Sequence, residues 1–395
     1  MVDWLGLEPL LIFAILVALL FDFYNGLHDS ANSIATVVAT RALPVWAALI
    51  LASVANFAGA FWGLEVANTV GKIILPAEVT ITMVIAALLG AIFWSVITVV
   101  LGIPISSSHA LVGGLIGAGL AAAGVDAIDR SSFDHAGEAG HILLLGAIAG
   151  AVFGTAIAAL SRSRILPGLL LGAWAGSAAL LVWNIYQGAV TVKGLFATVL
   201  FIAYSPFIGF CLAFTFGTVV AWIFHKAPPG KVKHLFRFLQ VGSSTFYSLG
   251  HGRNDAQKTM GVIAALLLAG GVTTEFTVPR EVIVACGIAI GLGTIIGGWK
   301  IVRTMGTRLT HLDTSQGFVA ETSSALGLHF MAEHGVPVST THSITGAILG
   351  VGALQRVSAV SWGVARRVVM AWIITIPLAA TVAALAYGAI RLVGL

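Results

Sequence analysis

The sequence has little charge, little cysteine and no ATP-binding loop. Only 9% of its 395 residues are charged, against about 25% in a soluble domain, while 58% are hydrophobic and the mean hydropathy is +1.00. These values exclude an ordinary cytosolic enzyme, a disordered protein and a nucleic-acid-binding protein. Cys211 and Cys286 lie in apolar runs and indicate neither a disulfide framework nor a metal site. Because a Gly-x4-Gly-Lys-(Ser/Thr) loop is missing, primary active transport by this chain is not expected.

Long apolar runs are abundant, and a membrane-spanning helix needs about 20 apolar residues. The sequence therefore predicts an all-α polytopic membrane protein with about 10–12 membrane segments in a lipid bilayer. The first eight residues hold Asp3 and Glu8 but no Lys or Arg, which predicts an initial membrane segment with an outside N-terminus rather than a signal peptide. After an apolar stretch at 9–21, the predicted runs lie at about 43–63, 79–102, 103–123, 141–160, 165–185, 194–224, 236–250, 259–271, 280–299, 316–331, 336–354 and 368–390.

A polar break near 225–234 divides the chain. It contains two adjacent prolines and three lysines, so the positive-inside rule predicts a cytoplasmic loop. We therefore expect a first transmembrane repeat at 1–224, a cytoplasmic linker at 225–235 and a second transmembrane repeat at 236–395, all within a single domain.

Two motifs recur in the same order in both halves. Gly26–Ser33 matches Gly252–Thr259 at an offset of 226 residues, and Pro104–His109 matches Pro337–His342 at an offset of 233. Three glycines behind the second motif repeat at the same offset of 233, with Gly113, Gly117 and Gly119 matching Gly346, Gly350 and Gly352. This ordered recurrence indicates an internal repeat.

Equivalent loops of the two halves differ in charge. The loop after the first Ser–His motif is acidic and the loop after the second is basic: Asp126, Asp129, Asp134 and Glu138 against Arg130 in the first, Arg356, Arg366 and Arg367 in the second. Likewise, the loop near 71–78 holds one basic residue, Lys72, and one acid, Glu78. Its counterpart in the second half holds Lys300, Arg303 and Arg308 against the single acid Asp313. Because basic loops stay in the cytoplasm, we predict two inverted-topology repeats with broken helices and re-entrant helical hairpins, a pattern typical of secondary transporters.

Each copy of the first motif carries an aspartate at the end of an apolar run. Asp29 and Asp255 would cost about 2.5–3.5 kcal/mol each at the bilayer centre, so we expect them to face a cavity or a cation. A glycine beside Asn or Asp lets a helix break and frees backbone carbonyls for a small cation. The alternative is that both aspartates are helix N-caps at the interface.

The second motif places hydroxyl side chains after a proline and before a small-residue helix: Ser106, Ser107 and Ser108 in the first copy, Ser339, Thr340 and Thr341 in the second. This order predicts two helix N-termini, whose backbone N–H groups and dipole favour an anion. Two such ends meeting in the membrane would bind a tetrahedral anion without Lys or Arg. The alternative is two self-capped helices. His109 and His342 either hydrogen-bond the loops or contact substrate or protons.

The other charged and polar residues within apolar runs have open interpretations. Glu321 is either a coupling-ion ligand or the partner of Arg253 or Lys258. We expect Asn56 to be its approximate counterpart in the first half, and Asp22 to be interfacial. Glycines spaced by four indicate helix-packing stripes, and four tryptophans indicate interfacial anchors; these are Gly146, Gly150, Gly154, Gly293 and Gly297, and Trp46, Trp183, Trp222 and Trp299.

On these motifs the chain resembles the inorganic phosphate transporter (PiT) family, whose duplicated signature is similar to Gly-Ala-Asn-Asp-Val-Ala-Asn-Ser and whose hairpins carry Pro-x-Ser-(Ser/Thr)-(Ser/Thr)-His. The resemblance covers essentially the whole chain. It implies a symporter that is not an enzyme and needs no cofactor, with the hydroxyls of 106–108 and 339–341 holding inorganic phosphate. It also implies that the coupling cation binds near His28, Asp29, Asn32, Asn254, Asp255 and Glu321, and that Asp29 and Asp255 hold any sodium or divalent metal.

His28 departs from the asparagine that sodium-coupled members have before the first aspartate. The string around it resembles the bacterial Pit branch, which is similar in taking up phosphate with protons, often as a neutral metal–phosphate complex. Histidine titrates near neutral pH and asparagine does not, so proton coupling is favoured, with sodium coupling as the alternative. The resemblance also implies a multi-pass protein of the cell inner (plasma) membrane that forms homodimers.

Three other functions remain open from the residues alone. Hydroxyl and N–H donors do not separate phosphate from another oxyanion such as sulfate or arsenate. An intramembrane enzyme would need a nucleophile and a base, for example Ser108 and His109, but adjacent residues of a helix do not face each other. A receptor that binds without transport is disfavoured by the duplicated half-sites.

Overall fold

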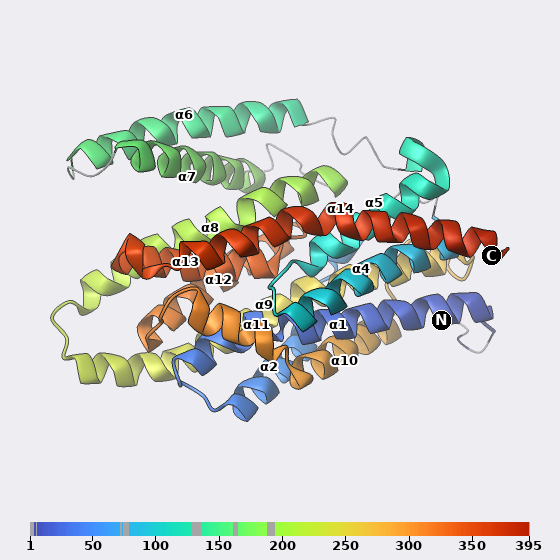
Figure 1. Cartoon of the computed structure of the whole chain (residues 1–395), viewed down its shortest axis with the longest axis horizontal. Helices are drawn as coiled ribbons and strands as arrows, with labels where there is room; N and C mark the ends of the chain where they lie inside the picture. Colours follow the sequence, from blue (N-terminus) through green and yellow to red (C-terminus); the bar gives the residue numbers. More distant parts are fainter. Residues whose placement is uncertain are drawn as a thin grey trace.

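The computed structural model describes residues 4, 6–71, 73, 79–127, 136–160, 165–187 and 194–394, and it contains helices and no strand within these ranges (Figure 1). The all-α prediction is confirmed. The helices are α1 (Pro9–Ala39), α2 (Val45–Gly59), α3 (Glu65–Val70), α4 (Ile81–Leu101), α5 (Ser107–Ala123), η2 (Gly124–Ala127), α6 (Ala136–Leu160), α7 (Ile165–Tyr186), α8 (Gly194–Phe224), α9 (Pro229–Ala269), α10 (Arg280–Ile296), α11 (Trp299–Arg303), η4 (Thr304–Arg308), α12 (Thr314–Glu333), α13 (Thr340–Gln355), η5 (Val357–Ala359) and α14 (Trp362–Leu392).

Six helices in the described ranges are long and apolar enough to cross a membrane, or seven if the bent pair α10 and α11–η4 is one span. The expected 10–12 segments also included the runs of α2, α7, α9, α12 and α13, which are outside this count. Among them, α9 has a lysine-rich start and a polar motif, and α13 begins with the second Ser–His motif, so both have a lower hydropathy. The number of membrane segments therefore stays a prediction.

The predicted helix breaks at the Asn/Asp motifs are wrong, because α1 and α9 each run through their motif without interruption. The expected runs at 236–250 and 259–271 are thus one helix of 41 residues. The motif glycines permit close packing instead: a Cβ on Gly26 would collide with the backbone of Ile290, and one on Gly252 with the backbone of Asn56. A broken helix does occur between α10 and α11, with a bend of 63° at Gly297, whose φ is +75°.

The two motif-bearing helices, α1 and α9, lie side by side and run antiparallel. Leu11 near the start of α1 contacts Gly270 just beyond the end of α9, while Thr40 at the end of α1 donates to Gln240 near the start of α9 at 2.8 Å. Equivalent segments of the two halves therefore run in opposite directions. This observation agrees with an inverted repeat, which stays a prediction.

Each half completes the packing of the other. The helix pairs α4–α5 and α12–α13 form the two predicted helical hairpins; α5 packs on α14, and α13 packs on α8. The turn of each hairpin is held by a short helix of the opposite half: Thr304, just after α11, donates to the carbonyl of Gly102 at 3.0 Å, and Thr69 in α3 donates to that of Gly335 at 2.6 Å.

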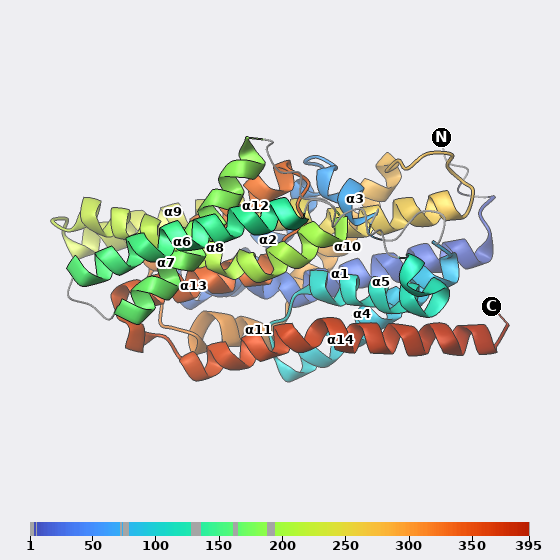
Figure 2. The same ribbon diagram turned by 90° about the horizontal axis from the view of Figure 1, so that it is seen from above.

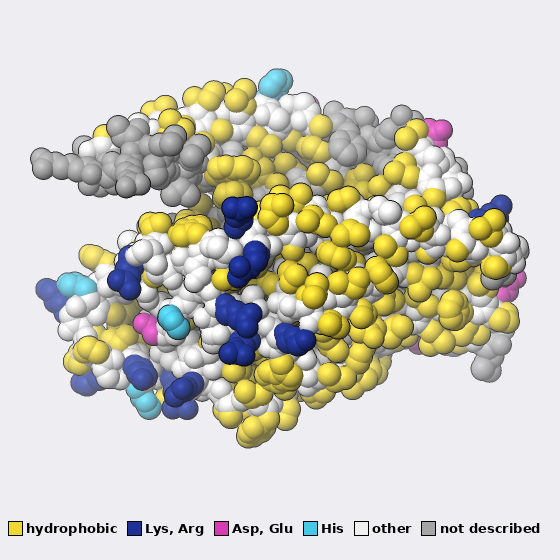
Figure 3. All heavy atoms as spheres, viewed as in Figure 1, with side chains coloured by type: hydrophobic (Ala, Val, Ile, Leu, Met, Phe, Trp, Pro, Cys, Tyr) yellow, Lys and Arg dark blue, Asp and Glu magenta, His cyan; other side chains and the backbone are white. Residues whose placement is uncertain are grey.

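The basic connections lie at one end of the bundle. Arg237 donates to the carbonyl of Ala42 at 3.3 Å, and Thr314 donates to that of Lys233 at 3.4 Å. The connection after α13 joins them through Ser361, whose N–H lies 2.8 Å from the Leu309 carbonyl. Figure 3 shows Lys and Arg side chains gathered toward this end and a largely hydrophobic surface toward the other. The loop residues Lys72, Glu78, Asp129, Arg130 and Asp134 lie outside the described residues.

The glycine stripe of α6 is a packing surface, as expected, and Gly293 packs on the backbone of Phe23, whereas Gly297 forms the bend after α10 and is not part of a packing stripe. Gly146 and Gly150 of α6 meet the backbone of Gly176 and Gly172 of α7, and these two helices form a layer along one side of the bundle (Figures 1 and 2). The tryptophans Trp46, Trp183, Trp222 and Trp299 are all exposed, as an interfacial position requires.

The matched glycines behind the second motif predict a large effect of added side-chain volume. A Cβ on Gly117 would meet the backbone of Ala380 in α14, and one on Gly350 that of Phe210 in α8. We expect Gly117→Val and Gly350→Val each to lower stability by about 1–3 kcal/mol, measured as thermal unfolding of detergent-purified protein. Gly363→Val is the control, because nothing lies within 4 Å of a Cβ there. Equal stability of all three variants would contradict these contacts.

Candidate functional site

The N-termini of α5 and α13 point toward the same place, beside Asp29 of α1. Ser106 caps α5 by accepting from the N–H of His109 at 3.3 Å, and Ser339 caps α13 by accepting from that of His342 at 3.2 Å. The self-capping alternative thus holds for these two hydroxyls. The other hydroxyls of both motifs, at 107, 108, 340 and 341, occupy the first turn of each helix and face inward.

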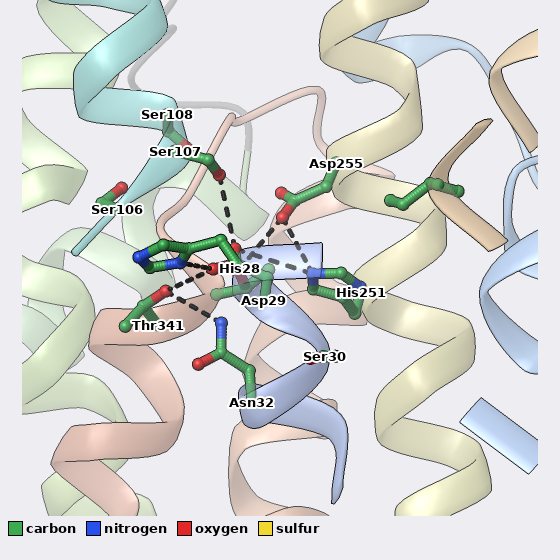
Figure 4. A network of polar contacts seen from close by, with 12 residues as sticks. His28, Asp29, Ser30, Asn32, Ser106, Ser107, Ser108, His251, Asp255 and Thr341 are labelled. Carbon is green, nitrogen blue, oxygen red and sulfur yellow. Dashed lines mark hydrogen bonds and ion pairs between the residues drawn. The ribbon is translucent and has the colours of Figure 1, made fainter. Parts of the chain in front are cut away.

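Asp29 lies between the two hairpins (Figure 4). Its Oδ2 is 3.3 Å from the hydroxyls of both Ser107 and Thr340, and its Oδ1 is 3.3 Å from that of Thr341. The Nδ1 of the adjacent His28 is 2.7 Å from Oδ1. Asp29 is therefore not a helix cap at the interface. It is a fully buried acceptor within α1 that contacts donors of both hairpins.

Asp255 on α9 faces the same space. Thr340 donates to its Oδ2 at 3.2 Å, so this hydroxyl lies between the two aspartates. His251, one turn earlier on α9, brings its Nε2 within 3.1 Å of Asp255 and 3.7 Å of Asp29. Atoms of Asp29, His251 and Asp255 lie within 4.8 Å of one another, close enough to hold a metal ion together.

Lys258 corrects the expectation that the anion site contains no basic residue. Its Nζ donates to Asp255, to the hydroxyl of Ser108 at 2.5 Å and to the carbonyl of Val338 at 3.0 Å. The lysine is 2% exposed. Burying an ammonium is tolerable here because a carboxylate and two neutral acceptors surround it.

The remaining predicted cation residues are placed differently. Asn32 donates to Thr341 at 2.8 Å and belongs to the site. Asn254 is fully buried, but neither of its amide atoms has a hydrogen-bond partner in the described ranges. Every hydroxyl residue of the two motifs, and every charged or imidazole group around Asp29, is at most 4% exposed, so the site is closed to both sides of the bundle.

Three of the matched positions at which the two halves differ change the chemistry of the site. At the offset of 226 residues, His28 corresponds to Asn254, Asn25 to His251, and Asn32 to Lys258. Histidine and asparagine are thus exchanged between the halves at the first two positions. Both imidazoles nevertheless reach Asp29, one from α1 and one from α9. The matched positions of the two halves therefore differ in chemistry at the site.

Glu321 forms a separate cluster between α1, α9 and α12. It accepts from Thr36 and Ser243 at 2.5 Å each and from Gln240 at 3.2 Å. It pairs with neither Arg253 nor Lys258, so that alternative is wrong. Asn56 is not in this cluster, because it contacts His251 at 3.0 Å and donates to Thr294 at 2.9 Å.

Arg253 joins the second hairpin to α9 at the edge of the site. Its guanidinium lies 2.5 Å from Glu333 at the end of α12, 3.7 Å from Glu65 of α3, and 5.3 Å from the centroid of the Trp62 ring.

His109 and His342, the residues after the hydroxyls, meet each other with ring centroids 4.4 Å apart. The two hairpins are therefore in direct contact.

The sequence alone did not single out His251 and Tyr247, and it gave Lys258 only as a partner for Glu321. Tyr247 is fully buried and donates to the carbonyl of Thr340 at 3.2 Å. For Lys258 a signal was present, because the repeat pairs it with Asn32, which was itself a candidate. For Tyr247 no motif signal exists.

This arrangement has oxygen, imidazole and hydroxyl groups from four helices within one buried volume. The carboxylates can hold a cation, since hard cations prefer oxygen ligands. The helix N-termini, hydroxyls and Lys258 can donate to an oxyanion. An anion and a cation bound together would nearly neutralise each other, which reduces the cost of carrying either one through a membrane.

Known proteins resemble the chain over its full length. A model described as the phosphate transporter family matches residues 25–167 and 224–383. A "probable low-affinity inorganic phosphate transporter" of Rhizobium meliloti (strain 1021) is 46% identical over 388 residues, 98% of each chain. One of Bacillus subtilis (strain 168) is 37% identical over 96% of this chain and 98% of its own. A solved structure titled "The sodium-dependent phosphate transporter" superposes with a TM-score of 0.70 at 26% identity, covering 98% of this chain and 100% of its own.

Proposed function

Because the chain belongs to the phosphate transporter family, in which the related proteins are transporters and not enzymes, we propose that this membrane protein imports inorganic phosphate by symport with a cation. The observation that carries the proposal is the convergence of the α5 and α13 N-termini on Asp29. It supports the proposal because hydroxyl and N–H groups that could donate to an oxyanion lie directly against carboxylates that could hold a cation.

Phosphate would bind between the two hairpins, at the hydroxyls of 107, 108, 340 and 341. In the closed arrangement three of these hydroxyls donate to Asp29 or Asp255. A cation bound at the aspartates would occupy their oxygen lone pairs, so the hydroxyls would turn toward phosphate. Cation binding would thus prepare the phosphate site, which is the coupling that a symporter needs. Ser106 and Ser339 would fix the helix ends by capping them.

We favour the proton as the coupling ion. Lys258 supports this choice in addition to His28. Its ammonium donates to Asp255, in the place where a metal cation could otherwise bind, whereas the first half has the neutral Asn32 at the matched position. Asp255 is therefore neutralised by a side chain of the protein and does not need a sodium ion. His28 and His251 then offer titratable groups beside Asp29. Sodium coupling is the second candidate, since the similar solved structure is named as sodium-dependent.

The basic end of the bundle would face the cytoplasm and the N-terminus the outside. With α1 and α9 antiparallel, the two repeats would be inverted, and the hairpins would meet near the bilayer midplane. The inner membrane, a homodimer and transport of a metal–phosphate complex are further proposals that follow from the resemblance to the bacterial branch.

The test is uptake of labelled phosphate by protein reconstituted in liposomes. A proton gradient and a sodium gradient are imposed separately, each with and without added divalent metal. We expect accumulation under the proton gradient in sodium-free buffer, and little competition by excess sulfate. Uptake under sodium alone would overturn proton coupling, and no uptake under any gradient would overturn symport.

A further inference from the structure

A second group of buried polar side chains lies between α1 and α9, outside the site around Asp29. Asp22 is fully buried, not interfacial as its position in the sequence suggested. It stands on α1 seven residues before Asp29. Asn25, on the next turn of α1, is 2% exposed, and Thr259 of α9 is fully buried. The antiparallel register of the two helices brings Thr259 opposite Asp22.

The polar atoms of this group have no hydrogen-bond partner within the described part of the chain. This holds for both carboxylate oxygens of Asp22, both amide atoms of Asn25 and the hydroxyl of Thr259. Yet the Asn25 and Thr259 side chains lie next to the Asp22 carboxylate. Buried polar groups are paired in most native structures, and each unpaired one costs about 1–3 kcal/mol. The cluster therefore lacks a ligand that would satisfy several oxygens together.

Thr259 itself points to a ligand. A threonine within a helix usually donates back to the carbonyl four residues earlier, as Thr294 and Thr381 do here at 2.8 and 2.7 Å. Thr259 makes no such bond. Its hydroxyl oxygen is thus free to accept a cation beside Asp22.

We propose that Asp22, Asn25 and Thr259 bind a monovalent metal cation of sodium size. The ligands are a carboxylate, an amide oxygen and a hydroxyl, which suit a hard cation. A single carboxylate is neutralised by one positive charge, whereas a divalent ion would leave net charge among apolar groups. A proton on Asp22 would complete one hydrogen bond and leave the other oxygens unpaired.

The surroundings agree with a singly charged ion. The other charged groups that act electrostatically on Asp22 are Asp255 and His251, and Asp255 is already paired with Lys258. On the α10 side the neighbour is the buried thiol of Cys286, which is neutral. No second free carboxylate is therefore present among the described neighbours to hold a divalent ion.

The position of the site suggests that a cation binds there before it reaches Asp29. Polar side chains recur on α1 at 22, 29 and 36, two helical turns or about 10 Å apart, and thus share a face. They belong to three successive clusters, around Asp22, Asp29 and Glu321. A cation entering from the end of the bundle that holds the α1 N-terminus would meet Asp22 first. This site goes beyond phosphate symport and would exist whichever ion drives it.

The test is equilibrium binding of radioactive sodium to the full-length protein in detergent, at fixed pH, with choline keeping the ionic strength constant. Relative to wild type, we expect Asp22→Asn to bind one sodium ion fewer, and Thr259→Val to weaken that component by about tenfold. The same loss should appear when Asp22→Asn is added to Asp29→Asn, because the two sites are separate. Thr381→Val, a back-bonded helical threonine on the surface, should leave binding unchanged.

Unaltered sodium binding in both Asp22→Asn and Thr259→Val would overturn the proposal. Wild-type protein that binds no sodium at all would overturn it as well. Phosphate uptake by wild-type liposomes, measured in parallel, separates the two ideas. Uptake without an Asp22-dependent sodium ion removes this site and leaves phosphate symport in place.

Discussion

Asp29→Asn and Asp255→Asn should each abolish coupled phosphate uptake. Each substitution keeps the side-chain shape and removes the charge that accepts from the hairpin hydroxyls. Removing one partner of a buried charged pair costs about 3–5 kcal/mol, which corresponds to a loss of about two to four orders of magnitude. For Asp255 the loss also leaves the buried Lys258 ammonium without its counter-charge.

The measurement is initial uptake into liposomes at equal protein density. Glu275→Gln is the matched control, since this acid is exposed and lies outside both motifs. All variants should still elute as wild-type protein by size exclusion. Near-normal uptake by both aspartate variants would show that the carboxylates have only a structural role.

Lys258→Asn should have an effect of similar size, with a different signature. The change installs the residue that the first half has at the matched position, Asn32, and leaves Asp255 buried without its ammonium partner. Under a proton gradient in sodium-free buffer, we expect uptake to fall by about two to three orders of magnitude. External sodium should restore part of the uptake, because a sodium ion can occupy the position that the ammonium has vacated.

Rescue by sodium distinguishes two roles for this lysine. If the Lys258 ammonium takes the place of a dissolved sodium ion, sodium rescues the asparagine variant and not a Lys258→Met variant, which offers no oxygen ligand. If Lys258 instead binds phosphate directly, sodium rescues neither. Lys231→Asn, on the exposed start of α9, controls for the loss of a positive charge.

The sequence was sufficient for the parts of the fold that depend on composition and duplication. Apolar runs predicted the helices, and the repeated Ser–His motif predicted the N-termini of α5 and α13. The sequence was not sufficient for features that depend on which helix packs against a given residue. Gly26 and Gly252 do not break their helices, because the facing helices, α10 and α2, approach so closely that only glycine fits.

The polar contacts show the same limit. Asp22 has no feature in the sequence that separates an interfacial aspartate from a buried one, because its burial follows from the register of α1 against α9. Glu321 is assigned to Ser243, Gln240 and Thr36 rather than to Arg253 or Lys258, since the two basic residues face Glu333 and Asp255 instead. The partner of a buried polar side chain can be assigned only when its neighbours in the folded protein are known.

The exchange of histidine and asparagine between the half-sites bears on the resting state of the protein. In a duplicated protein with identical inverted halves, swapping their conformations would interconvert the inward-open and outward-open states at equal free energy. If the two halves of this chain are inverted repeats, as we propose, the differences at the site, with His28 against Asn254, His251 against Asn25 and Lys258 against Asn32, help to remove that degeneracy. One access state should then predominate without substrate, and its population should shift with a substitution that makes a matched pair alike.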